Sequence, residues 1–314
     1  MATTTNNSLS ELVKERAYNL DFDLCGIAPS GNLKEHGSII ENWCSSGMNG
    51  DMTYLGQNIE KRISPAILVP GAKSVIVTGM NYYTDKRQLG EDIPIISRYA
   101  YGADYHDVIK GRLNKILDYI INLVPGTRGK CFVDSAPIIE KAWAREAGLG
   151  WTGRHSILIN NKIGSFFFIG VIITNNEFKY DESFDEDYCG ICRACVDACP
   201  SGAINENRTI DVRKCISYLT VESKTPIPEE MLNKMEGRVF GCDICQEVCP
   251  WNKIAKPHRI PEFNLSGEVE QMNVDDWQNL SREQFKGLFR KSSISRRTFQ
   301  RFSTNISIAT KPAG

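Results

Sequence analysis

Eight of the eleven cysteines fall within one stretch, residues 189–249, at spacings that suit iron–sulfur chemistry. The first run has the ferredoxin pattern C-x2-C-x2-C-x3-C-P and consists of Cys189, Cys192, Cys195 and Cys199. In a run of this kind three closely spaced thiolates bind one 4Fe–4S cluster, and the fourth ligates the partner cluster. A second run starts at Cys215, is interrupted by an insertion, and resumes with Cys242, Cys245 and Cys249. The pattern predicts two clusters and therefore electron transfer.

Applying this crossed rule divides the eight cysteines into two complete ligand sets. Cluster 1 takes Cys189, Cys192, Cys195 and Cys249, and cluster 2 takes Cys199, Cys215, Cys242 and Cys245. Structural zinc is the alternative, but zinc sites ordinarily use two C-x2-C pairs separated by a longer loop. An unbroken C-x2-C-x2-C, with proline after both fourth cysteines, favours clusters. The other three cysteines stand alone among apolar neighbours, and we expect them to be structural thiols.

The elements that must position this module alternate between strand and helix. Apolar patterns predict strands at 74–80 and 130–134 and a helix at 108–124. A further helix is expected to start at Ser135, with Pro137 in its first turn. Two β-rich runs, 156–160 and 165–174, are joined by a hairpin or another tight connection. The acidic stretch 181–187 then marks a change of composition.

These patterns predict an α/β domain at 1–180, a ferredoxin-like domain at 181–260 and a C-terminal helical segment at 261–314. The formal net charge of −1 gives no strong overall field toward nucleic acid or membrane. No stretch approaches the roughly 18 apolar residues of a membrane span, and residues 1–10 lack the features of a leader peptide. We expect a cytoplasmic monomer that does not contact a membrane.

Several motifs outside the cysteines resemble a known family, the epoxyqueuosine reductases, which are cobalamin-dependent iron–sulfur enzymes of tRNA modification. The resemblance covers most of the chain. It rests on residues 97–106 (SRYAYGADYH), 134–137 (DSAP) with Glu140, 147–155 (AGLGWTGRH), 215–220 (CISYLT), 241–246 (GCDICQ) and 249–252 (CPWN). Ordinary ferredoxins share only the cysteines, so these motifs are specific.

The resemblance implies a nitroreductase-like α+β domain that binds cobalamin, fed with electrons by the ferredoxin-like domain. The implied substrate is a tRNA carrying epoxyqueuosine at the wobble position, whose epoxide is reduced to give queuosine. An external low-potential electron donor is implied as well. Longer members continue into a helical-repeat domain that helps to hold tRNA, and this chain resembles a short form without it. The implied cofactor-binding residues are Gln57, Ser97, Tyr105, His106, Asp134, Ser156, Leu158, Asn160, Glu222 and Lys224.

Asp134 is the expected catalytic residue, as donor of a proton to the substrate. It ends a predicted strand, where open α/β sheets commonly place reacting groups. A carboxylate at a helix N-terminus is favoured in its ionised form, whereas a general acid must carry a proton. The alternative is that Asp134 only caps the following helix. His106 is not expected to bind cobalt, because position 109 is isoleucine where the cobalt-binding motif has glycine.

The segment 282–301 carries seven basic residues against one acid, with Phe285, Phe289 and Phe299 interleaved. This pattern suits an edge that grips RNA phosphates beside the active site. It equally suits a solvated helix face whose phenylalanines lie in the core. Three other classes of protein remain open: a reductive dehalogenase-like enzyme acting on a small molecule, a simple electron carrier, and a flavin oxidoreductase.

Overall fold

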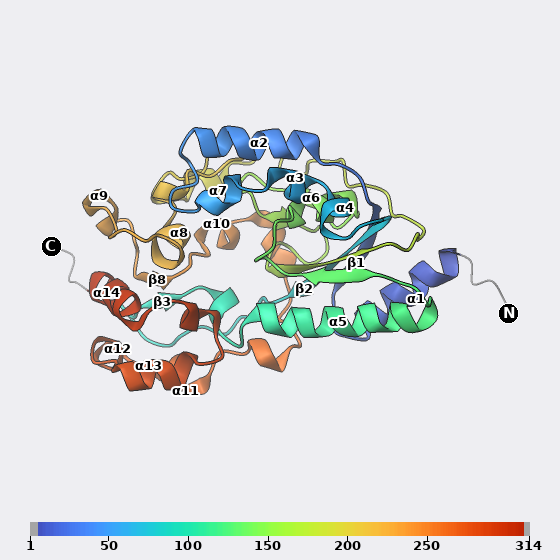
Figure 1. The fold of residues 1–314 in the computed structure, drawn as a ribbon. Coiled ribbons are helices and arrows are strands. Elements are labelled where there is room, and N and C mark those ends of the chain that lie inside the picture. Colours follow the sequence, from blue (N-terminus) through green and yellow to red (C-terminus); the bar gives the residue numbers. More distant parts are fainter. Residues whose placement is uncertain (1–5, 311–314) are drawn as a thin grey trace.

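The computed structural model describes residues 6–310, and its centre is a four-stranded sheet (Figure 1). In spatial order the strands are β1 (Leu24–Pro29), β2 (Ser74–Asn81), β7 (Phe167–Thr174) and β4 (Gly129–Phe132). All neighbours pair antiparallel, so the first domain is α+β. Every residue of β2 is buried, which is why its sequence is a nearly continuous apolar run.

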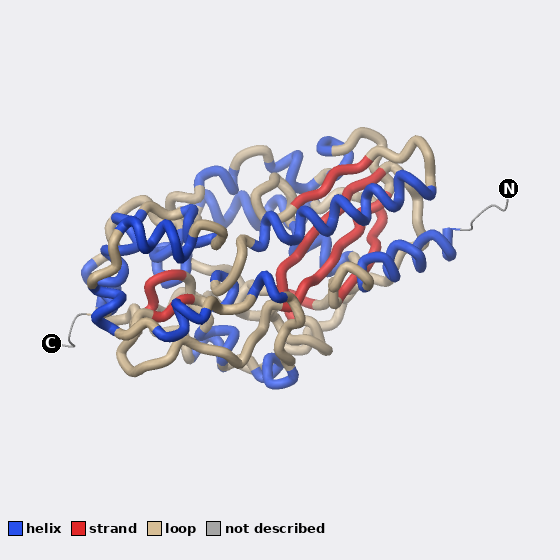
Figure 2. The backbone as a smooth tube through the Cα atoms, turned by 90° about the horizontal axis from the view of Figure 1, so that it is seen from below, coloured by secondary structure: helices blue, strands red, loops and turns tan. Residues whose placement is uncertain are grey.

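Helices cover both faces of this sheet. Helices α1 (Asn6–Tyr18) and α5 (Tyr105–Leu123) lie across one face, as Figure 2 shows. Ile109, Leu113 and Ile116 of α5 recur at helical spacing and pack against that face. The opposite side carries α2 (Lys34–Ser45), α3 (Ile59–Ile63), α4 (Pro65–Leu68) and α6 (Glu140–Glu146).

The prediction that a helix starts at Ser135 is wrong, because α6 begins five residues later, at Glu140. Residues 134–139 form a loop of tight turns instead. The Ser135 N–H donates to the Val133 carbonyl at 2.6 Å, which closes a three-residue turn around Asp134. Asp134 has a φ of 54°, a left-handed conformation that is uncommon for a non-glycine residue. It does not cap α6, whose N-cap is Ile139 with no side-chain bond.

The two β-rich runs are joined by a tight connection rather than a paired hairpin. Strand β6 (Leu158–Ile159) pairs with β5 (Trp151–Thr152), whereas β7 pairs with β2 and β4. A single antiparallel bridge, Asn160 with Gly164, links the start and end of the connection. This connection directs the 151–159 segment away from the sheet and toward the cysteine module.

The cysteine module consists of short elements. They are α7 (Ala194–Asp197), η3 (Val212–Lys214), α8 (Ile216–Val221), α9 (Glu229–Leu232), β8 (Arg238–Phe240), α10 (Ile244–Glu247) and η4 (Pro250–Ile254). Strand β8 lies in the insertion between Cys215 and Cys242 and pairs parallel with β3 (Ile95–Ile96) of the first domain. The insertion thus ties the module to the segment that leads into α5.

The C-terminal helices pack on this junction. They are η5 (Pro261–Phe263), α11 (Gly267–Gln271), α12 (Val274–Gln278), α13 (Arg282–Phe289), η6 (Ser293–Arg296) and α14 (Phe299–Ala309). Two short helices earlier in the chain are η1 (Thr53–Gly56) and η2 (Arg98–Ala100). Trp277, Phe285 and Phe302 share one hydrophobic core with Ile96 and Phe240. Within residues 6–310, no helix has the length and apolar character needed to cross a membrane.

Candidate active site and cluster cavities

Two neighbouring cavities collect the eight cysteines of the module. The smaller, of about 230 Å³, is lined by Cys189, Cys192, Cys195 and Cys249, the set expected for cluster 1. The larger, of about 810 Å³, is lined by Cys199, Cys215, Cys242 and Cys245, the set expected for cluster 2. Each predicted ligand set therefore surrounds its own cavity, and the insertion brings Cys215 back to its partners.

The chemistry of both cavities suits iron–sulfur clusters. Burial raises the pKa of Cys242 to about 12, so its thiolate needs the positive charge of iron. Buried donors without a partner in the described chain, Arg154 Nε and His155 Nε2, belong to residues that line the smaller cavity. Cluster sulfur atoms would satisfy such donors.

His155 also lines the larger cavity, so it lies between the two cluster positions. Its Nδ1 accepts the Ile157 N–H at 3.2 Å, which leaves Nε2 to carry the proton. Burial, followed by the charge of Lys141, lowers the pKa of His155 to about 4. The imidazole is therefore neutral near pH 7, and its Nε2–H would be available to a cluster bound in either cavity.

Asp134 faces the larger cavity, with 61% of its side chain accessible. The Tyr105 hydroxyl donates to Asp134 Oδ2 at 2.5 Å, and His106 Nε2 lies 3.3 Å from the same oxygen. Desolvation raises the pKa of this carboxyl. The hydrogen bonds from His106 and Tyr105 outweigh desolvation and hold the pKa below its ordinary value. Without substrate, Asp134 is an anion with two donors aimed at it.

The proton is held instead by His106. Its Nδ1 lies 2.7 Å from Asp104 Oδ1, so the imidazole is held between two carboxylates. Burial works against the imidazolium, but hydrogen bonds to Asp104 and Asp134 outweigh it and raise the pKa of His106 to about 9. On the far side, Arg296 Nε donates to Asp104 Oδ2 at 2.7 Å.

Glu140 fixes the backbone of the Asp134 loop. Its Oε1 accepts the Asp134 N–H at 2.5 Å. Burial, and then the charge of Asp134, raise the pKa of Glu140 to about 8. This contact adds to the bond from the Ser135 N–H to the Val133 carbonyl, and the two hold the backbone on either side of Asp134. The antiparallel order of the sheet also means that the rule for parallel sheets is not what places Asp134 at the cavity.

The other predicted cofactor-binding residues divide into two groups. Besides Tyr105, His106 and Asp134, the larger cavity is lined by Ser97, Ser156 and Glu222. The remaining four lie outside its lining: Gln57, Leu158, Asn160 and Lys224. Leu158 is buried in the core, and the Asn160 side chain bonds the backbone of residues 149, 162 and 163.

Several lining residues are not among the site residues predicted from the sequence. They include Tyr54, Lys141, His155, Arg296 and Arg297. His155 and Tyr99 do fall within the motifs quoted for the family resemblance, so those motifs could have indicated them. The two arginines come from the basic C-terminal segment, which sequence reasoning placed near RNA but not in the cavity wall.

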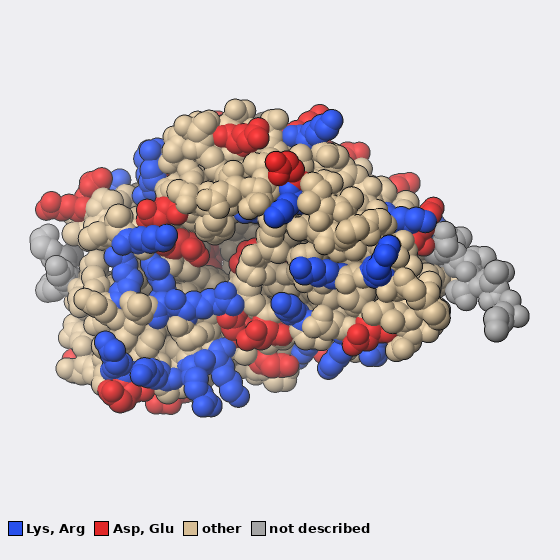
Figure 3. All heavy atoms as spheres, viewed as in Figure 1, with Lys and Arg blue, Asp and Glu red and all other residues tan. Residues whose placement is uncertain are grey.

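The basic segment 282–301 has features of both structures considered for it, a helix with its phenylalanines in the core and an exposed basic edge. Phe285 and Phe289 are buried in the core, as expected for an ordinary amphipathic helix. Arg297 and Arg301 turn inward and donate to the carbonyls of Ser223 and Leu219. The exposed basic residues are Arg282, Lys286, Arg290, Lys291 and Arg296. Figure 3 shows Lys and Arg side chains gathered over the C-terminal helices.

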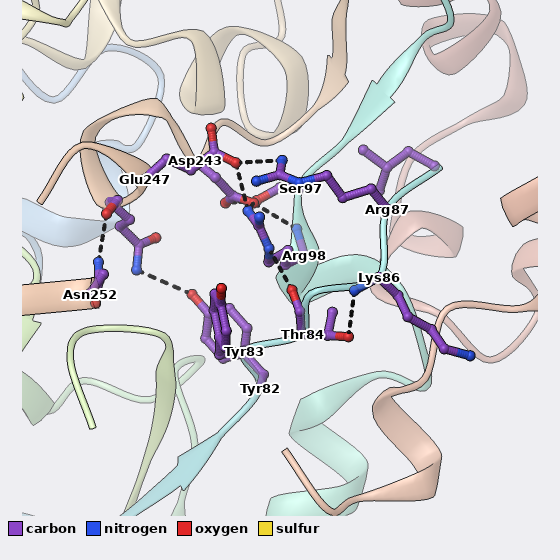
Figure 4. Close-up of polar contacts among 12 residues, drawn as sticks. Tyr82, Tyr83, Thr84, Lys86, Arg87, Ser97, Arg98, Asp243, Glu247 and Asn252 are labelled. Atoms are coloured by element: carbon purple, nitrogen blue, oxygen red, sulfur yellow. Dashed lines mark hydrogen bonds and ion pairs between the residues drawn. The ribbon is translucent and has the colours of Figure 1, made fainter. Parts of the chain in front are cut away.

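A buried ion network ties the cysteine module to the segment before α5, at the wall of the larger cavity (Figure 4). Arg98 is only 4% exposed, and its Nη1 lies 2.7 Å from Glu247 Oε1 and 3.4 Å from Asp243 Oδ2. The Arg98 N–H also donates to Asp243, as does the Ser97 hydroxyl. Asp243 stands between Cys242 and Cys245, so the network fixes both cysteines against the cavity.

Replacing Arg98 by methionine is expected to lower the free energy of unfolding by about 3–5 kcal/mol, because Asp243 would keep a buried charge without its partner. The measurement is the urea midpoint of the cluster-loaded protein. Arg87→Met is the matched control, since Arg87 contacts the same Glu247 but its side chain is 58% exposed. It should cost less than about 1 kcal/mol. Equal losses in the two variants would refute a specific role for the buried pair.

A two-cluster module set against a cavity that holds an Asp–His–Asp line defines an iron–sulfur oxidoreductase with proton-donating groups. Residues 188–252 match the 4Fe-4S double cluster binding domain, which confirms the two-cluster module. Residues 62–135 match the family described as "Epoxyqueuosine reductase QueG, DUF1730". The epoxyqueuosine reductase of Cellulophaga algicola is 42% identical over 96% of this chain and 98% of its own length. The chain belongs to the epoxyqueuosine reductase family.

Solved structures agree with this assignment. A crystal structure of epoxyqueuosine reductase with a tRNA-Tyr epoxyqueuosine-modified stem loop has a TM-score of 0.89 and 30% identity, covering 97% of this chain and 81% of that one. The Bacillus subtilis epoxyqueuosine reductase has a TM-score of 0.88 and 28% identity, covering 97% and 82%. In that structure a catalytic loop bearing an aspartate is swung out of the active site.

A B12-dependent reductive dehalogenase is a more distant neighbour. Its TM-score is 0.51 at 16% identity, and the match covers 98% of this chain but 37% of that one. This likeness shows a shared fold alone. It carries no argument for dehalogenation by the present chain.

Proposed function

We propose that this protein reduces the epoxide of epoxyqueuosine in a tRNA anticodon to the alkene of queuosine, with cobalamin and cluster 2 in the larger cavity. One observation carries the proposal: the Asp134 carboxylate and the four cysteines of the second set line the same cavity. An electron source and a proton source therefore face a common space. Relatives with the family's name along nearly the whole chain support this assignment.

The reaction needs two electrons and two protons, and the epoxide oxygen leaves as water. When bound, cobalamin supplies a strongly reducing cobalt centre next to the cluster that feeds it. The residues available to hold it are those of the cavity wall, among them Tyr105, Ser156 and Glu222. Arg297 Nε has no partner in the described part of the chain, and a polar group of the cofactor would satisfy it.

Asp134 is the group that delivers a proton to the departing oxygen. Its carboxyl must first be protonated, and His106, 3.3 Å away, is the adjacent source. Tyr105 keeps Asp134 oriented through its hydroxyl and is itself fixed by stacking on Phe168, with ring centroids 4.2 Å apart. Once substrate closes the cavity, loss of water opposes the carboxylate and favours transfer of the proton to Asp134.

Electrons enter through cluster 1 in this scheme. Cys192 is exposed, and Ile191 beside it is 97% exposed, so the smaller cavity lies close to the surface. The donor is an external low-potential carrier that approaches this loop. A cluster held by Cys199, Cys215, Cys242 and Cys245 would supply electrons within the larger cavity, which these cysteines line. We propose that the enzyme acts on its tRNA substrate as a monomer in the cytoplasm.

The test is turnover by the anaerobically purified protein loaded with both clusters and cob(II)alamin. A chemical reductant and an anticodon stem loop carrying epoxyqueuosine are added, and the nucleosides are analysed by mass spectrometry. Conversion to a nucleoside that lacks one oxygen atom is expected only when cobalamin is present. Equal conversion without cobalamin, or none with it, would refute the proposal.

A further inference from the structure

We propose that Arg296 is a positioning residue that joins an RNA phosphate to the Asp104–His106–Asp134 line, through which His106 returns a proton to Asp134. This inference rests on the proposed function and assigns it a proton path and a link to RNA binding. It depends on contacts between parts of the chain that are far apart in sequence, since Arg296 and Asp104 are 192 positions apart.

The line runs along the wall of the larger cavity, from the half-exposed Arg296 to Asp134, and both of these end residues line that cavity. Arg296 Nε donates to Asp104 Oδ2 at 2.7 Å, Asp104 Oδ1 lies 2.7 Å from His106 Nδ1, and His106 Nε2 lies 3.3 Å from Asp134 Oδ2. Asp104 is also the N-cap of α5 and accepts the His106 N–H at 3.1 Å, which fixes its carboxylate. A carboxylate on Nδ1 holds the imidazole in one orientation, with Nε2 directed at the reacting group.

Arg296 has the geometry to serve two partners. Its side chain is 51% exposed, and only Nε is used by Asp104. Neither of its outer nitrogens has a partner among the described residues. A guanidinium can therefore hold Asp104 with one edge and bind a phosphate with the other. Arg282, Lys286, Arg290 and Lys291 extend this basic edge along the surface.

The proton balance follows from the same contacts. Asp134 gives a proton to the epoxide oxygen and becomes a carboxylate, the imidazolium of His106 gives its Nε2 proton to that carboxylate, and solvent reloads His106. The charged and titratable groups around His106 are Asp104, Tyr105, Asp134, Glu140 and Arg296. The carboxylates stabilise the imidazolium form of His106. The positive charge of Arg296 partly offsets the stabilisation that Asp104 provides.

The pH dependence has a definite sign. The raised pKa of about 9 means that His106 is charged below that pH and loses its proton as pH rises through it. The rate at saturating RNA should therefore fall on the alkaline side. Asp104→Asn removes the main support of the imidazolium, so this fall should move to lower pH, with a rate about tenfold lower near pH 8. Arg296→Gln removes a positive charge, so the fall should move to higher pH.

The experiment compares single-turnover rates of the cluster- and cobalamin-loaded wild type, Arg296→Gln, Asp104→Asn and Arg290→Gln across pH, with stem-loop RNA varied to saturation. Arg290→Gln is the matched control, because Arg290 is exposed on the same edge. It should weaken RNA binding and leave the saturated rate unchanged. Arg296→Gln should weaken RNA binding and also lower the saturated rate about tenfold. The reason is that Asp104 loses its hydrogen bond from Arg296 and no longer positions His106 against Asp134.

Three results would overturn the inference. Arg296→Gln could affect only RNA binding, as Arg290→Gln does, or could lower the rate equally at every pH, as a folding defect would. In the double variant with Asp104→Asn, the two losses of rate could simply add, although residues in one network should not be additive. Cluster absorbance checks that each variant is folded. Wild-type turnover in the same series tests the proposed function separately, so the two failures are distinguishable.

Discussion

Replacing Asp134 by asparagine is expected to lower the single-turnover rate about a thousandfold, the range typical of a lost general acid. The amide has nearly the shape of the carboxyl and can still accept the Tyr105 hydroxyl, but it cannot deliver a proton. Cobalamin and RNA should still bind, since the contacts of Asp134 in the described structure are with the protein. The measurement is queuosine formation with both cofactors loaded.

Asp107→Asn is the matched control for this variant. Asp107 is an exposed carboxylate on the first turn of α5, close in sequence to the catalytic line. Its loss should change the rate less than twofold or so. If Asp134→Asn retains both the corrin spectrum and full turnover, the proton comes from elsewhere, and the larger cavity then has a different donor.

The presence of a two-cluster module could be predicted from the sequence because the spacing of its cysteines is local information. Ligand spacing along the chain fixes which thiolates can reach one cluster, whatever surrounds them. Bringing Cys249 to the first set, and Cys199 and Cys215 to the second, needs contacts between distant segments, and the fold supplies them. The antiparallel sheet was harder to predict, since a fully buried strand such as β2 has the same apolar run in a parallel sheet.

The loop of Asp134 could not be predicted because local preference and tertiary contacts disagree there. Ser135 and Pro137 favour a helix start, yet the chain turns twice before α6 begins. The contact that decides the geometry is between Glu140 and the Asp134 N–H, and no propensity scale contains it. The strained φ of Asp134 coincides with the residue proposed to act on the substrate, a common association.

The role of Arg296 could not be predicted from the sequence either. Composition marked the whole 282–301 segment as basic, but composition cannot separate residues that face solvent from those that face the protein. In the fold, Arg297 and Arg301 hold the module, while Arg296 meets Asp104. Only the packing of the C-terminal helices on β3 and β8 assigns these different tasks to neighbouring arginines.

The assignment of cysteines to clusters predicts a second large effect, the loss of one cluster when a single cysteine is replaced. Cys199 ends the first run in sequence, yet it lines the larger cavity with Cys215, Cys242 and Cys245. Cys199→Ala should therefore remove cluster 2, halve the iron content and abolish turnover. Cluster 1 should remain reducible, because its four cysteines surround the other cavity. The measurements are iron per chain and the electron paramagnetic resonance spectrum of the reduced protein.

Paired variants make this result specific. With crossed ligation, the spectrum of Cys199→Ala should match that of Cys215→Ala, and the spectrum of Cys249→Ala should match that of Cys189→Ala. With ligation in sequence order, Cys199→Ala would match Cys189→Ala instead. The two pairings give opposite assignments from the same four proteins. A match of Cys199→Ala with Cys189→Ala would mean that the electron path into the larger cavity starts from a different set of thiolates.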